Sequence, residues 1–156
     1  MFVSLFVLDI KLCGQAFGVY KAVLDGQDID FSFPRTEKLI GTKHTDFEII
    51  VDPFIGEEKA SQRRDFTINA MAFGLDGEIV DPFGGKSDIK SRVIRTVGSA
   101  EDRFSEDGLR ILRAIRFASV LGFTIEKETA EAIHKLSRML DKVSFERVFS
   151  EMSKII

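Results

Sequence analysis

The chain has 156 residues, enough for one ordinary domain or two small ones with a buried core. Hydrophobic residues make up 44% and charged residues 30%, and this globular composition excludes a disordered chain. The formal net charge of −3 excludes a uniformly basic surface that coats nucleic acid, while a local basic patch stays compatible with it.

The first half of the sequence predicts antiparallel strands, because Val, Ile, Leu and Phe are frequent in short runs separated by turn signals. Asp25–Gly26 is a hairpin turn signal between two of these runs. Asp52–Pro53 ends the last run, since proline halts a regular element. The predicted strands cover residues 5–11, 16–24, 29–33 and 47–51.

A helix is predicted over residues 56–73, where apolar residues recur without proline. Its first turn contains Glu57 and Glu58, whose charges favour the positive end of a helix dipole. Residues 75–81, with Asp76–Gly77 inside them, predict a small hairpin after this helix.

After Gly85 the apolar pattern becomes helical. Ser99 or Ser105 is the candidate cap of a helix that runs to about Leu121 and ends at Gly122. Two further helices are predicted over residues 127–140 and 145–156. The sequence thus predicts an α+β fold, with a small α+β domain over residues 1–85 and a helical domain over residues 86–156.

The cysteine and histidine counts restrict the chemistry. Cys13 is the only cysteine, which excludes an internal disulfide and favours a reducing, cytoplasmic location. His44 and His134 are too isolated to form a zinc site. The apolar start, residues 1–8, lacks a basic leader and is too short to span a bilayer, so we expect no membrane partner.

One charged segment has the composition of a nucleobase reader. Asp107 and Arg110 are three residues apart and Glu106 and Arg110 four apart, so a helix would bring these side chains together. A carboxylate beside a guanidinium matches the amine and ring nitrogen of cytosine and adenine, whereas guanine and uracil present a carbonyl in place of that amine. The alternative is an intrahelical salt bridge that contributes about 0.3–0.5 kcal/mol.

A second charged segment favours phosphate and ribose. Arg63 and Arg64 are fork-shaped donors suited to phosphate oxygens, and Asp65 is a candidate acceptor for a ribose hydroxyl. Asn69 follows four residues later on the same expected helix face. Arg113 is a further candidate for a phosphate or RNA contact. The alternative for these arginines is ion pairing with nearby carboxylates, which would only brace the fold.

Four motifs resemble those of the tRNA nucleotidyltransferase and poly(A) polymerase family, the bacterial-type, class II CCA-adding enzymes. Residues 63–72 resemble its ribose and triphosphate motif, and residues 106–110 resemble its nucleotide-reading motif. Residues 81–85 are similar to its junction between head and neck, and residues 144–148 to the Ser-x-Glu-Arg element that braces the neck helices. The resemblance implies a partial polymerase-beta-like nucleotidyltransferase head followed by an all-helical neck.

The resemblance also implies an activity: template-independent nucleotidyl transfer from CTP or ATP to RNA 3′ ends, as in tRNA CCA addition or polyadenylation. Mg²⁺ would be the cofactor, and tRNA or another RNA the partner. The alternative is a catalytically incomplete nucleotide-binding or RNA-binding fragment that pairs with a separate fragment or with its own copies. The implied nucleotide-binding residues are Arg63, Arg64, Asp65, Asn69, Glu106, Asp107, Arg110 and Arg113.

The family's Gly-Gly-x-Val-Arg-Asp segment does not occur in this sequence, and Asp28-Ile29-Asp30 is the Asp-x-Asp near its start. Strand alternation would place both carboxylates on one face, as a candidate metal clamp. The surrounding residues resemble the family's later head strands, which assigns catalysis and metal binding to Asp30 and leaves Asp28 as an exposed strand-end residue. We therefore expect the main metal-binding pair upstream of Met1, a shortened chain that also ends before the family's body and tail, and little or no activity of this chain alone.

Overall fold

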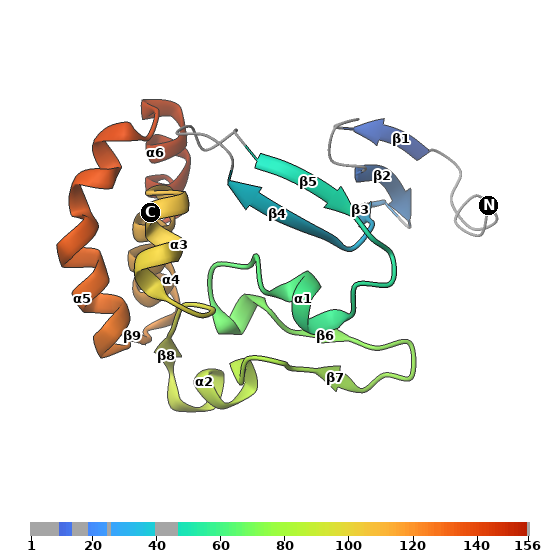
Figure 1. Ribbon diagram of the computed structural model, residues 1–156, viewed down its shortest axis with the longest axis horizontal. Helices are drawn as coiled ribbons and strands as arrows, with labels where there is room; N and C mark the ends of the chain where they lie inside the picture. The colour runs from blue at the N-terminus through green and yellow to red at the C-terminus, as the bar shows by residue number, and fades with distance from the viewer. Residues whose placement is uncertain (1–9, 14–18, 25, 40–46, 156) are drawn as a thin grey trace. The chain divides into compact units, whose positions relative to one another are not determined.

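The computed structural model describes residues 10–13, 19–24, 26–39 and 47–155 (Figure 1). The chain divides into two compact units, residues 1–56 and residues 57–156. The described part of the first unit contains strands, and the second unit contains helices with short β pairs, so the fold is α+β as predicted. The boundary between these compact units lies between Gly56 and Glu57 and reflects packing within each unit. The predicted boundary between functional domains at residue 85 is a different division, and it stays a prediction.

The first unit holds two antiparallel sheets. One has the order β1-β2-β3, and the other pairs β4 with β5. The bounds are β1 (Ile10–Cys13), β2 (Val19–Leu24), β3 (Gln27–Ser32), β4 (Arg35–Leu39) and β5 (Phe47–Val51).

The strand predictions of the first unit are largely confirmed. β5 has the predicted bounds, and β3 begins two residues before its predicted start and ends one residue before its predicted end. β2 ends at Leu24 as predicted, and residues 16–18 of that predicted strand lie outside the described residues. Of the strand predicted over residues 5–11, only residues 10 and 11 lie in the described part, and both belong to β1. β4 was missed because its sequence, RTEKL, is polar and contains few strand-forming residues. Its pairing with β5 supplies the structure that local propensity does not.

The predicted continuous helix over residues 56–73 is wrong. Only α1 (Glu57–Ser61) is α-helical, and it is followed by a 3₁₀ turn, η2 (Thr67–Asn69), and by strand β6 (Ala72–Phe73). Pairing between distant segments overrides the helical pattern: Thr67 N donates to Arg95 O at 3.0 Å and Val97 N donates to Asp65 O at 3.1 Å. The same pairing buries Phe66 completely.

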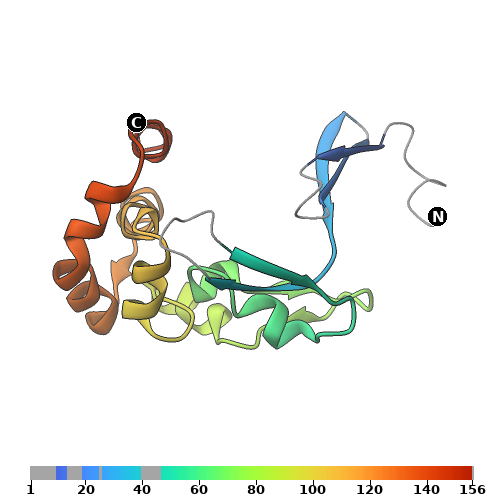
Figure 2. The ribbon, with the colours of Figure 1, turned by 45° about the horizontal axis from the view of Figure 1, so that its top comes forward.

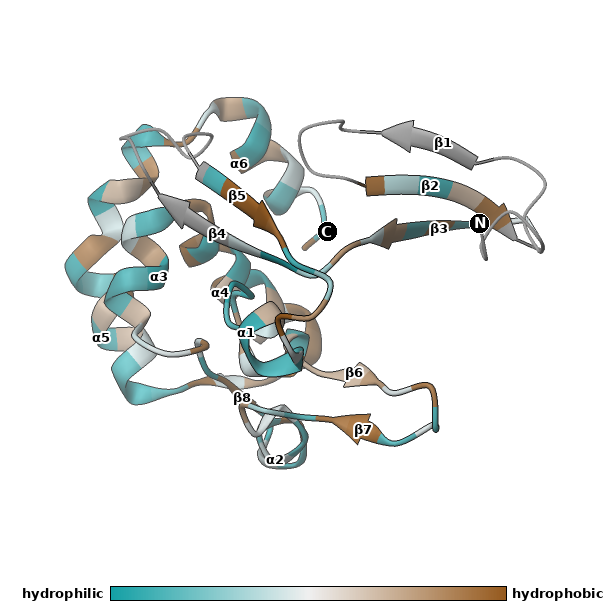
Figure 3. Ribbon diagram, turned by 45° about the vertical axis from the view of Figure 1, so that its right-hand side comes forward, coloured by the Kyte–Doolittle hydropathy of each residue, from teal (hydrophilic) through white to brown (hydrophobic). Residues whose placement is uncertain are grey.

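A hairpin follows, as predicted, between β6 and β7 (Ile79–Val80). It presents apolar side chains to solvent: Phe73, Leu75 and Ile79 are exposed. Figure 3 shows this hairpin with brown, hydrophobic residues on both strands.

The helix predicted to end at Leu121 consists of two helices, α3 and α4, separated at Asp107 and Gly108. The Ser99 hydroxyl caps α3 by accepting a hydrogen bond from Asp102 N at 3.3 Å. Gly122 ends α4 with φ 65°, the left-handed conformation that glycine adopts readily. The remaining elements are α2 (Gly85–Ser91), β8 (Val93–Ile94), α3 (Ala100–Glu106), α4 (Leu109–Leu121), β9 (Thr124–Ile125), α5 (Lys127–Leu136), η3 (Ser137–Lys142) and α6 (Phe145–Met152).

These helices form a bundle within the second unit, in which α3 packs on α5 and α4 packs on α6 (Figures 1 and 2). The parallel pair β8–β9 lies at one end of the bundle. Two buried clusters make up its core: Phe66, Ile94 and Ala114 in one, and Phe104, Ile111 and Ala132 in the other. No helix in the described part of the chain is long and apolar enough to cross a bilayer.

Two glycines allow close approach of backbones inside this unit. A Cβ on Gly108, between α3 and α4, would lie 2.5 Å from the carbonyl oxygen of Met139 in η3. A Cβ on Gly85, at the start of α2, would lie 2.3 Å from the carbonyl oxygen of Thr67. Any larger residue would push these elements apart, so both positions require glycine.

Candidate functional site

Asp107 occupies the break between α3 and α4, where its backbone is extended with φ −152° and ψ 107°. Its Oδ1 accepts hydrogen bonds from Leu109 N at 3.1 Å and from Arg147 NH1 at 3.1 Å. Its Oδ2 accepts from Arg147 NH2 at 2.7 Å. The direct partner of Asp107 is therefore an arginine of α6, 40 positions away in sequence.

The electrostatics of this position keep the carboxyl group ionised. Partial burial raises the pKa of Asp107, but the hydrogen bonds from Arg147 and Leu109 N and the charges of Arg147 and Arg110 outweigh it. The net effect is a pKa below the ordinary value of 3.8. At neutral pH, Asp107 is a pure hydrogen-bond acceptor.

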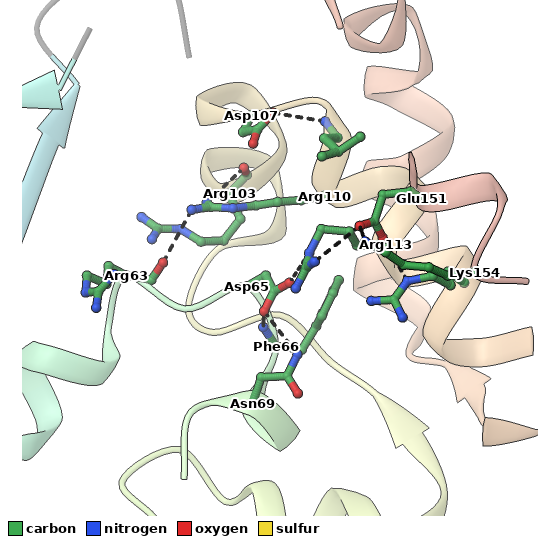
Figure 4. A network of polar contacts seen from close by, with 12 residues as sticks. Arg63, Asp65, Phe66, Asn69, Arg103, Asp107, Arg110, Arg113, Glu151 and Lys154 are labelled. Carbon is green, nitrogen blue, oxygen red and sulfur yellow. Dashed lines mark hydrogen bonds and ion pairs between the residues drawn. The ribbon is translucent and has the colours of Figure 1, made fainter. Parts of the chain in front are cut away.

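Arg110 projects from the first turn of α4 and is held in one orientation (Figure 4). Its NH1 donates to Glu106 Oε2 at 2.6 Å and to Arg103 O at 3.1 Å, and its NH2 donates to Arg63 O at 3.3 Å. Glu106 is shared, because its Oε1 accepts from Arg103 NH2 at 2.6 Å. The predicted trio Glu106, Asp107 and Arg110 is thus brought together, although the helix on which the prediction relied is broken at Gly108.

Arg103 also contacts the other charged segment, through a hydrogen bond from its NH1 to Gln62 O at 3.1 Å. Together, Arg103 and Arg110 therefore hold the backbone of residues 62 and 63 against the start of α4. Sequence reasoning missed this role of Arg103, since the carbonyl groups that it contacts have no signature in the sequence. Its spacing of three residues from Glu106 was the one local signal.

Asp65 is buried, with 8% of its surface exposed. Its Oδ1 accepts from Phe66 N at 3.0 Å and Asn69 Nδ2 at 3.3 Å, and its Oδ2 accepts from Arg113 Nε at 2.6 Å (Figure 4). The structure brings together three predicted site residues, Asp65, Asn69 and Arg113. In this arrangement Asp65 orders its own segment, and its contact with a ribose hydroxyl stays a prediction.

Arg113 also faces Glu151 of α6, which is 4% exposed. Glu151 Oε2 accepts from Arg116 Nε at 2.7 Å, and its Oε1 accepts from Lys154 Nζ at 2.8 Å and lies 3.6 Å from Arg113 NH1. Burial raises the pKa of Glu151, but the Lys154 hydrogen bond and the arginine charges bring it below its ordinary value. Sequence reasoning missed Glu151, which lies 35 positions from Arg116.

Arg64 is exposed and lies next to this network, and Arg63 is partly buried. In the first unit, Asp28 and Asp30 are both exposed on the same face of β3, as strand alternation predicts. The carboxylate of Asp30 lies 3.8 Å from Lys21 Nζ across the hairpin. Among the residues that the structure describes, no three His, Cys, Asp or Glu side chains gather where they could hold a metal ion. The assignment of Asp30, and secondarily of Asp28, as a metal ligand stays a prediction.

The second unit also contains a pocket of about 730 Å³ between the start of α3 and the length of α5. Its lining includes Arg95, Thr96 and Glu126, together with the ion pair between Glu101 and Lys135. None of the eight predicted nucleotide-binding residues lines it. The pocket therefore does not coincide with the predicted nucleotide-binding residues.

Two family models match the sequence. A model described as "Poly A polymerase head domain" matches residues 7–95, and one described as "Probable RNA and SrmB- binding site of polymerase A" matches residues 122–156. Together they include β1 to β8 and α5 to α6.

The CCA-adding enzyme of Bacillus subtilis (strain 168) is 57% identical over 99 residues, covering 64% of this chain and 25% of the relative. A crystal structure of the Bacillus stearothermophilus CCA-adding enzyme in complex with CTP matches with a TM-score of 0.83 and 36% identity, covering 98% of this chain and 36% of that one. A tRNA nucleotidyltransferase complexed with a primer tRNA and an incoming ATP analog matches with a TM-score of 0.73 and 30% identity, covering 93% and 40%. The chain thus spans about a quarter of the length of the curated relative.

Proposed function

The chain belongs to the family of the poly A polymerase head domain, and from this membership we propose that it is part of a nucleotidyltransferase that adds nucleotides to tRNA 3′ ends without a nucleic-acid template. The similarity to enzymes described with CTP, with an ATP analog and with a primer tRNA supports CTP, ATP and tRNA as its substrates. The arrangement of Asp107 beside Arg110 is the observation that carries the proposal, because these two side chains would replace a template base.

The chemistry of this pair suits two of the four bases. The ionised Asp107 can only accept hydrogen bonds, and Arg110 can only donate them. The described contacts use three of the five N–H groups of Arg110, which leaves donors for a ring nitrogen. Cytosine and adenine present an amine beside an unprotonated ring nitrogen. Guanine and uracil would place a carbonyl against the carboxylate, which costs about 1–3 kcal/mol.

In the proposed reaction the 3′ hydroxyl of the RNA attacks the α-phosphorus of the bound nucleotide, and pyrophosphate leaves. We assign the triphosphate to Arg63 and Arg64, whose guanidinium groups suit phosphate oxygens. Asp65, Asn69 and Arg113 order the segment that carries these arginines.

A divalent ion, which we propose to be Mg²⁺, would neutralise the charge of the triphosphate when bound. Asp30 is its proposed ligand among the described residues, and it would need further oxygen ligands to complete a site. The single cysteine of the sequence is compatible with the cytoplasm as the proposed compartment.

Calorimetric titration of this chain with Mg-CTP, Mg-ATP and Mg-GTP tests the proposal. We expect binding of CTP and ATP at least tenfold tighter than that of GTP, and Asp107→Ala should remove this preference. Asp102→Ala, which changes an exposed carboxylate of the same helix α3, is the matched control and should preserve it. Equal binding of all three nucleotides, or a preference that survives Asp107→Ala, would contradict the assignment of the reading pair.

A further inference from the structure

Arg147 lies on α6 and contacts Asp107 through two parallel hydrogen bonds, from NH1 to Oδ1 at 3.1 Å and from NH2 to Oδ2 at 2.7 Å. Bidentate pairs of this kind fix the plane of the carboxylate as well as its distance. Both side chains are partly buried, with 29% of Arg147 and 19% of Asp107 exposed, which limits screening by solvent. Arg147 therefore controls the orientation in which Asp107 meets a ligand.

A count of acceptor sites shows what this pairing leaves available. An ionised carboxylate offers about four lone-pair sites, two on each oxygen. Oδ1 already accepts two hydrogen bonds, from Leu109 N and from Arg147 NH1. Oδ2 accepts one, from Arg147 NH2. A single acceptor direction remains, on Oδ2.

This count separates guanine from cytosine and adenine. A carboxylate with both oxygens available can accept two parallel hydrogen bonds from guanine, one from its ring N–H and one from its amine. A carboxylate with one remaining acceptor direction satisfies one amine hydrogen, as cytosine and adenine require, and leaves a guanine donor unpaired. An unpaired buried donor is costly, so occupancy of Asp107 by Arg147 disfavours guanine.

We propose that Arg147 is a positioning residue that determines base specificity, because it restricts Asp107 to one acceptor for one exocyclic amine. The inference deepens the proposed function and rests on it: Arg147 itself touches no base, and its effect passes through Asp107. The Arg147 contact contributes to specificity by removing a hydrogen-bonding mode that the wrong base would use.

The charges around Asp107 agree with this role. Arg147 faces the carboxylate from α6 and Arg110 adds positive charge from α4, while Glu106 of α3 is held by Arg103 and Arg110. Removal of Arg147 leaves burial, which raises the pKa of Asp107, opposed by Leu109 N and Arg110 alone. The carboxyl group would then take up a proton at a higher pH than in the unchanged protein.

The test compares Arg147→Ala and Arg147→Lys with the unchanged chain, by calorimetric titration of Mg-CTP and Mg-GTP from pH 5.5 to 8. The unchanged chain should prefer CTP by a ratio that does not vary with pH. Arg147→Ala should reduce this ratio at least tenfold, with weaker CTP binding and stronger GTP binding, and its CTP binding should weaken further as the pH falls. Arg147→Lys retains the charge without the fork, so its ratio should fall while its CTP binding stays independent of pH.

Arg138→Ala, at an exposed arginine of η3, is the matched control and should leave the ratio unchanged. A merely structural role of Arg147 would weaken all nucleotides alike at every pH. An unchanged CTP-to-GTP ratio in folded Arg147→Ala or Arg147→Lys protein, while Asp107→Ala abolishes selectivity, would overturn the inference and leave the proposed function standing. An unchanged chain with no preference for CTP would overturn both.

Discussion

Arg113 is the residue through which two buried carboxylates are connected. It donates to Asp65 through Nε at 2.6 Å, and its NH1 lies 3.6 Å from Glu151. Two further cations, Arg116 and Lys154, also contact Glu151, so one carboxylate compensates several positive charges. The Arg116 guanidinium lies 4.0 Å from the centre of the Phe117 ring, which adds a cation–π contact to the cluster. The orientation of Asp65 therefore depends on a glutamate of α6.

Glu151→Gln should destabilise the second unit by about 3 kcal/mol, because it leaves partly buried cations without a countercharge. Urea unfolding at pH 7 measures this loss. The lowered pKa of Glu151 also determines how stability depends on pH, since the carboxyl group of the unfolded chain binds its proton near pH 4.5. The stabilisation by Glu151 is therefore complete above pH 4.5 and is lost as the pH falls through the lower pKa of the folded state. Glu151→Gln should therefore unfold with a weaker acid dependence.

The control for this substitution is Glu146→Gln, at an exposed glutamate of the same helix α6. It should change the free energy of unfolding by less than about 0.5 kcal/mol. If the two variants behaved alike at pH 7, the cation cluster would not stabilise the fold.

At the scale of elements, the junction of α3 and α4 positions Asp107 and Arg110, the proposed reading pair. Asp107 is extended there and Gly108 follows it against Met139, so the chain changes direction between Glu106 and Arg110. In an uninterrupted helix, the Asp107 side chain would contact its neighbours on the same helix. The break instead presents its carboxylate to Arg147 of α6.

Gly108→Ala should destabilise the second unit by about 1–3 kcal/mol, because its Cβ would lie 2.5 Å from Met139 O and force η3 away from the junction. Because the junction also sets Asp107, CTP affinity should fall together with stability. Thermal unfolding and calorimetry measure the two effects. Ser105→Ala, at an exposed position of α3, is the control and should change neither. If Gly108→Ala were as stable as Ser105→Ala, η3 would be able to shift and accommodate the added Cβ.

At the scale of the whole molecule, the second unit is held by contacts between segments that are distant in sequence. Arg110 and Arg63 are 47 positions apart, Arg113 and Asp65 are 48 apart, and Arg147 and Asp107 are 40 apart. The Arg110–Arg63 and Arg113–Asp65 contacts join residues of the proposed nucleotide site to each other. The Arg147–Asp107 contact joins Asp107 of that site to α6. A ligand that binds there should therefore stabilise the unit as a whole.

Mg-CTP at about 100 times its dissociation constant should stabilise the folded second unit by about 2.7 kcal/mol, which a thermal melt detects as a higher midpoint. Mg-ATP should act in the same way and Mg-GTP at equal concentration much less. Inorganic triphosphate with Mg²⁺ is the control, since it offers the phosphates without a base. Equal shifts from CTP and from inorganic triphosphate would show that the base is not read.

Local sequence carried enough information for several elements. The bounds of β5 were predicted because a run of β-branched residues meets proline, and α4 ends at Gly122 because glycine adopts φ 65° without strain. The proposed reading segment rests on residue types and spacing, and its role in reading a base stays a prediction. Asp65 and Asn69 were also expected close together, although by way of a helix that does not form.

Contacts between residues far apart in the chain explain the structural features that local sequence did not predict. Pairing of residues 65–67 with 95–97 replaced the expected helix, because it satisfies backbone groups and buries Phe66 at once. Asp107 was expected to lie close to Arg110, three positions on, and its side-chain hydrogen-bond partner is Arg147, which the spacing did not indicate. Spacing along the chain predicts contacts within one turn, and no local pattern encodes which side chain a distant helix will present. The sequence by itself thus determined which residue types are available to the candidate site, whereas the orientation of its carboxylates depends on how the helices pack.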